Sequence, residues 1–125
     1  MKKVIKTKNS ALPIAPYNQG ILINGVLYIS GQIAVNPATG ELIKESIEAE
    51  ARQVMQNIKG ILEEAGMGFS NVVKTSIFIS DMNNFALVNK IYAGYFTADF
   101  PARETIQAAG LPLGVNVEIS AIAVE

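Results

Sequence analysis

The sequence predicts a single α+β domain over residues 1–125, with the element order βββαβαββ and two helices packed on one mixed sheet. Three observations predict this class. An Asn-Gly pair lies between two short apolar runs, two longer segments repeat apolar residues in steps of three and four, and alternating strands follow those segments. Strands interrupted by two such helices are typical of a sheet with helices on one face. A chain of 125 residues buries one core comfortably, but not two.

The N-terminal part of the chain predicts three strands. Val4-Ile5 begins a short one, and a proline-punctuated loop follows. Ile21–Ile23 and Val26–Ser30 are separated by Asn24-Gly25, a pair that suits the two-residue type I′ turn. These two runs therefore predict a β-hairpin.

Two helices are predicted from apolar periodicity. The first covers Ser46–Ala65, with Ser46 as its N-terminal cap and Gly66 as its stop, and the second covers Asn84–Phe96. The acids of the first helix are expected on a solvated face: they are Glu48, Glu50, Glu63 and Glu64. The tyrosines that lie within apolar patterns are interpreted mainly as core residues: Tyr28, Tyr92 and Tyr95.

The remaining strands predict a sheet with one face left uncovered by helices. They span Val72–Ile79, Arg103–Ala108 and Val115–Val124. Neither face of these strands has the Lys and Glu density of a solvated sheet. A copy of the same chain is the simplest cover for the second face, so we expect a homo-oligomer.

The composition excludes several classes of chemistry. The chain has no Cys and no His, which removes disulfides, Cys nucleophiles, Ser-His-Asp triads and zinc sites built on these residues. A net charge of −1 gives no electrostatic case for nucleic acid. No apolar run reaches the roughly 18 to 20 residues of a membrane helix, and the N-terminus lacks the apolar block of a signal peptide, so a cytoplasmic location is expected.

Two charged residues stand out near the C-terminus. Glu118 is the only ionisable side chain between Thr105 and Val124, and Arg103 lies just before that stretch. A carboxylate in apolar surroundings is costly to bury unless a partner holds it. Arg103 and Glu118 together suit a site for a small carboxylate substrate. They suit a structural ion pair equally well, and the residues alone leave both interpretations open.

Polar and aromatic residues at three other places are candidates for a binding site. Tyr17 lies in a loop that has no periodic apolar pattern to explain a large aromatic side chain. It therefore either plugs a sheet edge or closes a pocket. Ser30-Gly31 offers a hydroxyl and bare backbone at a strand end, which suits a close ligand approach but also an ordinary strand end. Asn89 borders the apolar face of the second helix, within reach of a neighbour or a ligand.

These positions carry a family resemblance. The chain resembles the Rid family, the YjgF-like reactive-intermediate deaminases, along nearly its whole length. The matching pieces are Pro16-Tyr17 with Gln19-Gly20, Ser30-Gly31-Gln32, Asp81-Met82 with Phe85, Val88-Asn89, Tyr92 and Tyr95-Phe96, Pro101-Ala102-Arg103, and Val117-Glu118-Ile119 with Ala121-Ile122-Ala123. The resemblance implies a chorismate-mutase-like homotrimer around a central β-barrel, with a cleft between each pair of subunits. It also implies hydrolysis of 2-imino or 2-enamino acids, the unstable products of pyridoxal-dependent dehydratases, to 2-keto acids and ammonia.

The resemblance also implies roles for individual residues. Arg103 would bind the substrate carboxylate and Glu118 would activate water, as the two catalytic residues. No metal or cofactor is expected, because imines hydrolyse readily once they are positioned. The residues expected to bind the substrate are Tyr17, Ser30, Gly31, Asn89, Arg103 and Thr105, the last through its backbone carbonyl. A rival class is a module that binds 2-keto acids or amino acids without turnover.

Two residues depart from the family pattern. After the Arg, relatives commonly have a small residue and then a Cys, where this chain has Glu104 and Thr105. Thiol-dependent behaviour of relatives is therefore not carried over. Strand alternation places Thr105 on the side of Arg103 and Glu104 on the other side. As a charged residue at a usually small position, Glu104 is expected to alter the rim of the site and its substrate range.

Overall fold

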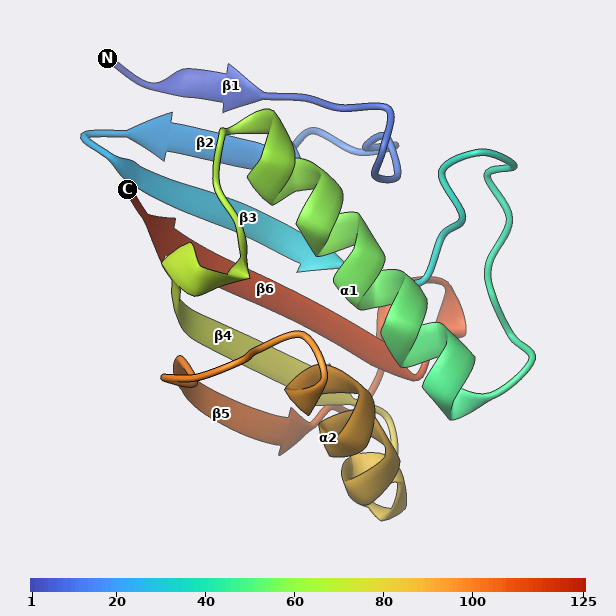
Figure 1. Cartoon of the computed structure of the whole chain (residues 1–125). Helices are drawn as coiled ribbons and strands as arrows, with labels where there is room; N and C mark the ends of the chain where they lie inside the picture. Colours follow the sequence, from blue (N-terminus) through green and yellow to red (C-terminus); the bar gives the residue numbers. More distant parts are fainter.

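The computed structural model describes residues 1–125 as one six-stranded sheet with two helices on one face (Figure 1). The elements are β1 (Lys3–Ile5), β2 (Gly20–Ile23), β3 (Val26–Gln32), α1 (Ile47–Glu64), β4 (Val72–Ile79), α2 (Phe85–Ala93), β5 (Ala102–Gln107) and β6 (Val117–Val124). The strand order is β1-β2-β3-β6-β4-β5. Only β4 and β5 run parallel. The predicted α+β class and the order βββαβαββ are confirmed.

The predicted hairpin is formed by β2 and β3. Asn24 and Gly25 connect the strands with φ angles of 51° and 76°, and Ile23 lies opposite Val26. Positive φ at both central residues is the requirement of a type I′ turn, which Asn and Gly meet more easily than other residues.

The helix α1 covers the centre of the sheet and supplies much of the core. The Ser46 side chain caps it by accepting a hydrogen bond from the Ala49 amide at 3.0 Å, and Gly66 follows its end with a φ of 75°. Val54, Ile58 and Ile61 pack against the inward residues of β3 and β6. Burying each such side chain contributes roughly 1.5–3 kcal/mol to stability.

The helix α2 is shorter than predicted. It ends at Ala93 because Gly94, a poor helix former, follows, and the chain then continues in tight turns through Tyr95 and Phe96. The Phe96 ring nevertheless packs on Tyr92, with ring centroids 4.9 Å apart. The apolar periodicity therefore identified the packing correctly but extended the helix by three residues.

The prediction that Glu50 is solvated is wrong. Glu50 is only 4% exposed, and its carboxylate accepts hydrogen bonds from the backbone amides of Asn116 and Val117 at 2.7 and 2.9 Å and from the Asn116 side chain at 3.0 Å. The start of β6 carries backbone donors that need an acceptor, and the first turn of α1 places Glu50 next to them. This contact joins α1 to the strand that carries Glu118.

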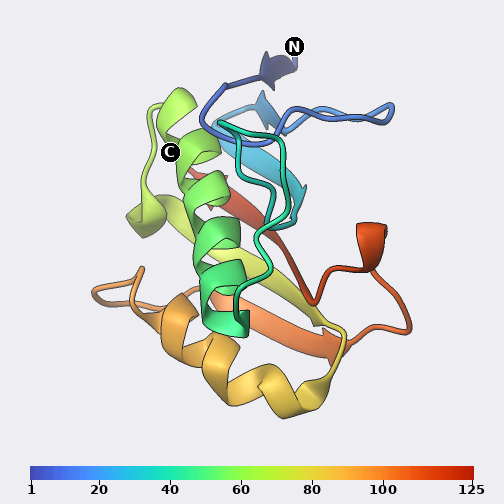
Figure 2. The same ribbon diagram turned by 90° about the vertical axis from the view of Figure 1, so that its right-hand side faces the viewer.

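The second face of the sheet has no covering layer. Figures 1 and 2 show α1 and α2 on the same side of the sheet. The opposite side, which we call the open face, presents apolar side chains from most strands: Val4, Ile21, Tyr28, Phe78, Ile106 and Ile122. Tyr28 is 49% exposed there, so its assignment to the core is wrong within one protomer. The open face also holds an ion pair, because Lys74 Nζ lies 3.1 Å from Glu104 Oε1.

Candidate functional site

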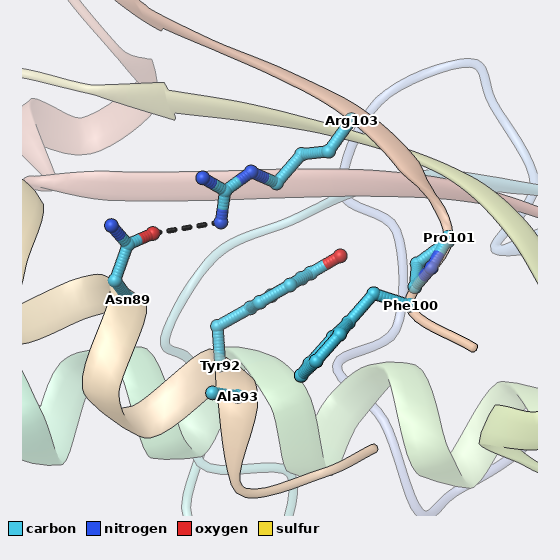
Figure 3. A pocket seen from close by; sticks show the side chains of 6 residues that line it. All are labelled: Asn89, Tyr92, Ala93, Phe100, Pro101 and Arg103. Atoms are coloured by element: carbon cyan, nitrogen blue, oxygen red, sulfur yellow. Dashed lines mark hydrogen bonds between the residues drawn. The ribbon is translucent and has the colours of Figure 1, made fainter. Parts of the chain in front are cut away.

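Arg103 lies on the helix-covered face of the sheet, above α2. It is side by side with Thr75 of β4, whose side chain points toward the helices. Arg103 Nη1 donates a hydrogen bond of 2.7 Å to Asn89 Oδ1, as Figure 3 shows. The guanidinium carbon lies 5.2 Å from the ring centroid of Tyr92 and 5.7 Å from that of Phe85. These contacts hold the guanidinium in place while most of its N–H groups stay free.

The Arg103 hollow is a depression of about 440 Å³ around this guanidinium. Its walls are Asn89, Tyr92, Ala93, Phe100, Pro101 and Arg103 (Figure 3). Tyr92 forms the floor, and its hydroxyl is hydrogen-bonded to Thr75 Oγ1 at 2.7 Å. Burial raises the pKa of Tyr92 above its usual value, so the phenol is neutral at physiological pH. The hollow therefore combines one fixed positive charge with an aromatic floor.

Glu118 lies in a different hollow, at the edge of the open face. Its neighbour across the ladder is Phe78 of β4, which points away from the helices. The Glu118 hollow has a volume of about 460 Å³, and its lining includes Tyr17, Ser30, Gly31 and Glu118. Burial raises the pKa of Glu118, because desolvation disfavours its charged form. The carboxylate makes no hydrogen bond or ion pair with another residue of the chain.

Gly31 is fitted to this carboxylate. The register between β3 and β6 shifts between Ile29 and Gln32, and Gly31 lies in that irregular segment. A Cβ at Gly31 would collide with Glu118 Oε2. The missing side chain therefore makes the space that the Glu118 carboxylate occupies. Next to it, the Ser30 hydroxyl donates to the backbone carbonyl of Asn18 in the loop that carries Tyr17.

Arg103 and Glu118 do not meet within one chain. Arg103 is in register with Thr75, Glu118 is in register with Phe78, and strand alternation points Thr75 and Phe78 to opposite faces. The only ion pair in the chain joins Lys74 to Glu104. A structural ion pair between Arg103 and Glu118 inside one protomer is therefore excluded, while a meeting of the two residues across subunits stays a prediction.

The two departures from the family pattern lie on opposite faces, as alternation predicts. Thr105 shares the face of Arg103, and its hydroxyl is buried without a hydrogen-bond partner. Glu104 is exposed on the open face, where hydrogen bonds from Ser76 and Lys74 lower the pKa of its carboxyl. Within one protomer Glu104 therefore does not border the Arg103 hollow.

Sequence reasoning missed three residues that shape the two hollows. Phe100 is exposed beside Arg103, and Tyr92 is both a core residue and the floor of that hollow. Leu113 lines the Glu118 hollow with a φ of 56°, an uncommon conformation for a bulky residue. The Leu-Pro-Leu-Gly segment around Leu113 indicated only a turn.

The structure contains no group of three or more His, Cys, Asp or Glu side chains placed to hold a metal ion. None of its helices has both the length and the apolar character that crossing a membrane requires. The two hollows present one guanidinium, one carboxylate with a raised pKa, hydroxyls and backbone groups.

The fold and the two hollows define a small α+β protein of the YjgF-like class, as comparisons with known proteins show. The sequence model for the family "Endoribonuclease L-PSP" matches residues 7–125. A 2-iminobutanoate/2-iminopropanoate deaminase of Bos taurus is 44% identical over all of this chain and 91% of its own length. A Rid-family protein of Yersinia pestis has the same fold with a TM-score of 0.97 and 49% identity, covering 100% of both chains. The E. coli protein TdcF, whose structure contains bound serine, has a TM-score of 0.95 and 38% identity over 98% of both chains.

The chain therefore belongs to the endoribonuclease L-PSP family, which is the YjgF/Rid family. Names within this family differ in the activity that they state, since "endoribonuclease" and "2-iminobutanoate/2-iminopropanoate deaminase" both occur. Membership supports a Rid-type function, and the chemistry of the two hollows must decide which activity to propose.

Proposed function

We propose that this protein is a 2-iminobutanoate/2-iminopropanoate deaminase. It would hydrolyse reactive imines and enamines from pyridoxal-dependent dehydratases to 2-keto acids and ammonia, in the cytoplasm where those enzymes act. Relatives at 42–44% identity carry this name. The observation that carries the proposal is the pair of complementary hollows, one with a held guanidinium and one with an unpaired carboxylate of raised pKa.

The proposed active site is complete only in an oligomer. Arg103 and Glu118 point to opposite faces of their own sheet, so a single site needs Arg103 from one subunit and Glu118 from another. The exposed apolar side chains of the open face support such an assembly, because isolated soluble domains rarely leave such a surface uncovered. We propose a homotrimer in which three open faces enclose a central β-barrel, with one cleft between each pair of subunits.

The assembly is testable at the centre of the open face. Tyr28→Lys introduces a charge that would be buried between subunits, so the variant should sediment as a monomer and lose deaminase activity. Tyr28→Phe keeps the apolar ring and should remain assembled. A wild type that sediments as a stable monomer at micromolar concentration would overturn the shared site.

The proposed mechanism begins with binding of the substrate carboxylate. Arg103 uses one N–H group on Asn89 and keeps others for two parallel hydrogen bonds to the carboxylate, a geometry that Lys does not reproduce. Tyr17 closes the pocket, and Ser30 and Gly31 line it. The backbone carbonyl of Thr105 contributes a further polar contact. Together these groups place the imine carbon near Glu118.

Glu118 then acts as general base and acid. It takes a proton from water as the water oxygen bonds to the carbon of the protonated imine, which gives a neutral carbinolamine. It returns that proton to the nitrogen; as the C–N bond then breaks to release ammonia, the hydroxyl proton passes to the Glu118 carboxylate and a 2-keto acid is left. The raised pKa makes the Glu118 carboxylate a stronger base than an ordinary one, so it holds the proton taken from water until the nitrogen accepts it.

A binding module without turnover is the second candidate, and the serine found in the structure of TdcF favours it as an alternative. A coupled assay separates the two functions. Threonine dehydratase acts on threonine with and without this protein, and the release of 2-ketobutyrate and ammonia is followed. Faster release supports the deaminase, while an unchanged rate together with saturable binding of 2-ketobutyrate supports the module.

A further inference from the structure

An apolar chamber adjoins the Glu118 hollow and has no role in the steps described so far. It has a volume of about 290 Å³ and lies between the N-terminal loop, the segment after β3 and the turn that holds Leu113. It shares four lining residues with the Glu118 hollow: Ile14, Tyr17, Ile33 and Leu113. The two spaces are therefore neighbours separated only by side chains.

The chamber is suited to an apolar group. Seven of its eleven lining residues are hydrophobic and none is charged. Of the two side-chain amides on its wall, Gln32 uses both its oxygen and its nitrogen in hydrogen bonds, and Asn36 uses its oxygen. Gln32 donates to the Ser30 carbonyl at 3.0 Å and accepts from the Ser10 hydroxyl at 2.9 Å, and Asn36 accepts from the Ala38 amide at 2.9 Å. A polar ligand would therefore find few free partners there, whereas a hydrocarbon group would lose none.

Leu113 forms the boundary between the chamber and the Glu118 hollow. It lines both spaces, is 62% exposed, and has a φ of 56° within the short turn Pro112–Gly114. A branched side chain rarely adopts this left-handed conformation, and such residues concentrate at ligand sites. The turn thus holds an apolar side chain at the junction, where a substrate would pass from one space to the other.

We infer that this chamber receives the side chain of the substrate, so that the protein prefers 2-imino acids with apolar side chains of about four carbons or more. This rests on the proposed function, which places the imine carbon at Glu118 and the carboxylate toward Arg103 of another subunit. The third substituent on that carbon is the side chain, and the shared residues Ile14, Tyr17, Ile33 and Leu113 lead it into the chamber. A methyl or ethyl group would leave most of the chamber unfilled.

The test compares two imines made in the same way. An amino-acid oxidase with catalase converts 2-aminobutyrate or leucine to its imine, and release of the keto acid is measured with wild type and with two variants. Ala11→Leu and Val35→Phe add carbon atoms at positions that line the chamber but not the Glu118 hollow. Ala109→Leu, on an exposed loop outside every pocket, is the matched control.

We expect wild-type kcat/KM for the leucine-derived imine to exceed that for the shorter imine by about tenfold or more, as extra methylenes in an apolar pocket provide. Each filling variant should remove most of that preference and leave kcat/KM for the shorter imine within about twofold. Equal wild-type activity on both imines, or a parallel loss of activity on both in each variant, would refute the proposal that the chamber binds the substrate side chain. Acceleration of neither imine would instead refute the proposed deaminase, and the chamber with it.

Discussion

The replacement of Arg103 by lysine is the sharpest test of how the site would bind a carboxylate. Lysine keeps the positive charge but provides a single point contact in place of the planar fork. Loss of one charge-assisted hydrogen bond costs about 1.5–3 kcal/mol. Since about 1.4 kcal/mol corresponds to a tenfold change, kcat/KM for the imine should fall roughly 10- to 100-fold.

Stability should change much less than activity in this variant. The Arg103 side chain is exposed, and its contacts with the rings of Tyr92 and Phe85 are worth about 0.5–1 kcal/mol each at an exposed site. Thermal unfolding should therefore show a small shift, and Arg103→Ala should abolish activity in a protein that still folds. Arg52→Lys is the matched control, because Arg52 is the other arginine of the chain and lies exposed on α1.

The assay is steady-state release of 2-ketobutyrate with threonine dehydratase, together with calorimetric titration of 2-ketobutyrate and thermal unfolding of each variant. An unchanged kcat/KM in Arg103→Lys would refute bidentate binding. Unfolding of Arg103→Ala would show that the guanidinium serves the fold and not the substrate.

Three further changes test the remaining parts of the site. Glu118→Gln should depress turnover at least a hundredfold with little change in 2-ketobutyrate binding. Because the pKa of Glu118 is raised in the folded protein, its ionisation opposes folding, and wild-type stability should fall as pH rises from the ordinary carboxyl range through the raised pKa. Denaturation of Glu118→Gln at several pH values should lack that fall. Gly31→Ala should push the Glu118 carboxylate aside and lower kcat more than tenfold, whereas Gly110→Ala, where nothing lies within 4 Å of the added Cβ, should leave kcat unchanged. Glu50→Ala should reduce the free energy of unfolding by about 3–5 kcal/mol in urea titrations, because it leaves buried backbone donors at the start of β6 unpaired. Glu64→Ala, at an exposed position, should change that free energy by less than about 0.5 kcal/mol. Equal effects of the two substitutions would contradict the role of Glu50 as the acceptor for these donors.

The elements of the fold could be predicted because their signals are local. Asn24-Gly25 specifies its own turn, and the periodic apolar residues of α1 specify the buried face of that helix without reference to distant residues. The exposure of Glu50 was predicted wrongly because the same local reasoning treats every acidic residue outside the apolar positions of the helix as solvated. The backbone donors that it meets lie 66 and 67 residues further along the chain, and no local pattern contains them.

The relation between the candidate catalytic residues could not be predicted for a similar reason. Alternation gives the side of Arg103 relative to Glu104 and Thr105, and the side of Glu118 within its own strand. It does not say how the two strands are related. That relation depends on β4, which lies between β5 and β6 and pairs with one in parallel and with the other antiparallel. The pairing register with β4, which aligns Arg103 with Thr75 and Glu118 with Phe78, decides that the two side chains point apart.

The placement of Arg103 and Glu118 on opposite faces has a genetic consequence. Each chain would donate its guanidinium to one cleft and its carboxylate to another, so two dead variants could rescue each other. If the proposed trimer is reassembled from equal amounts of Arg103→Ala and Glu118→Gln subunits, about a quarter of the clefts would receive both intact residues. Two damaged alleles in one cell would then yield partial function, whereas either one alone would behave as a loss.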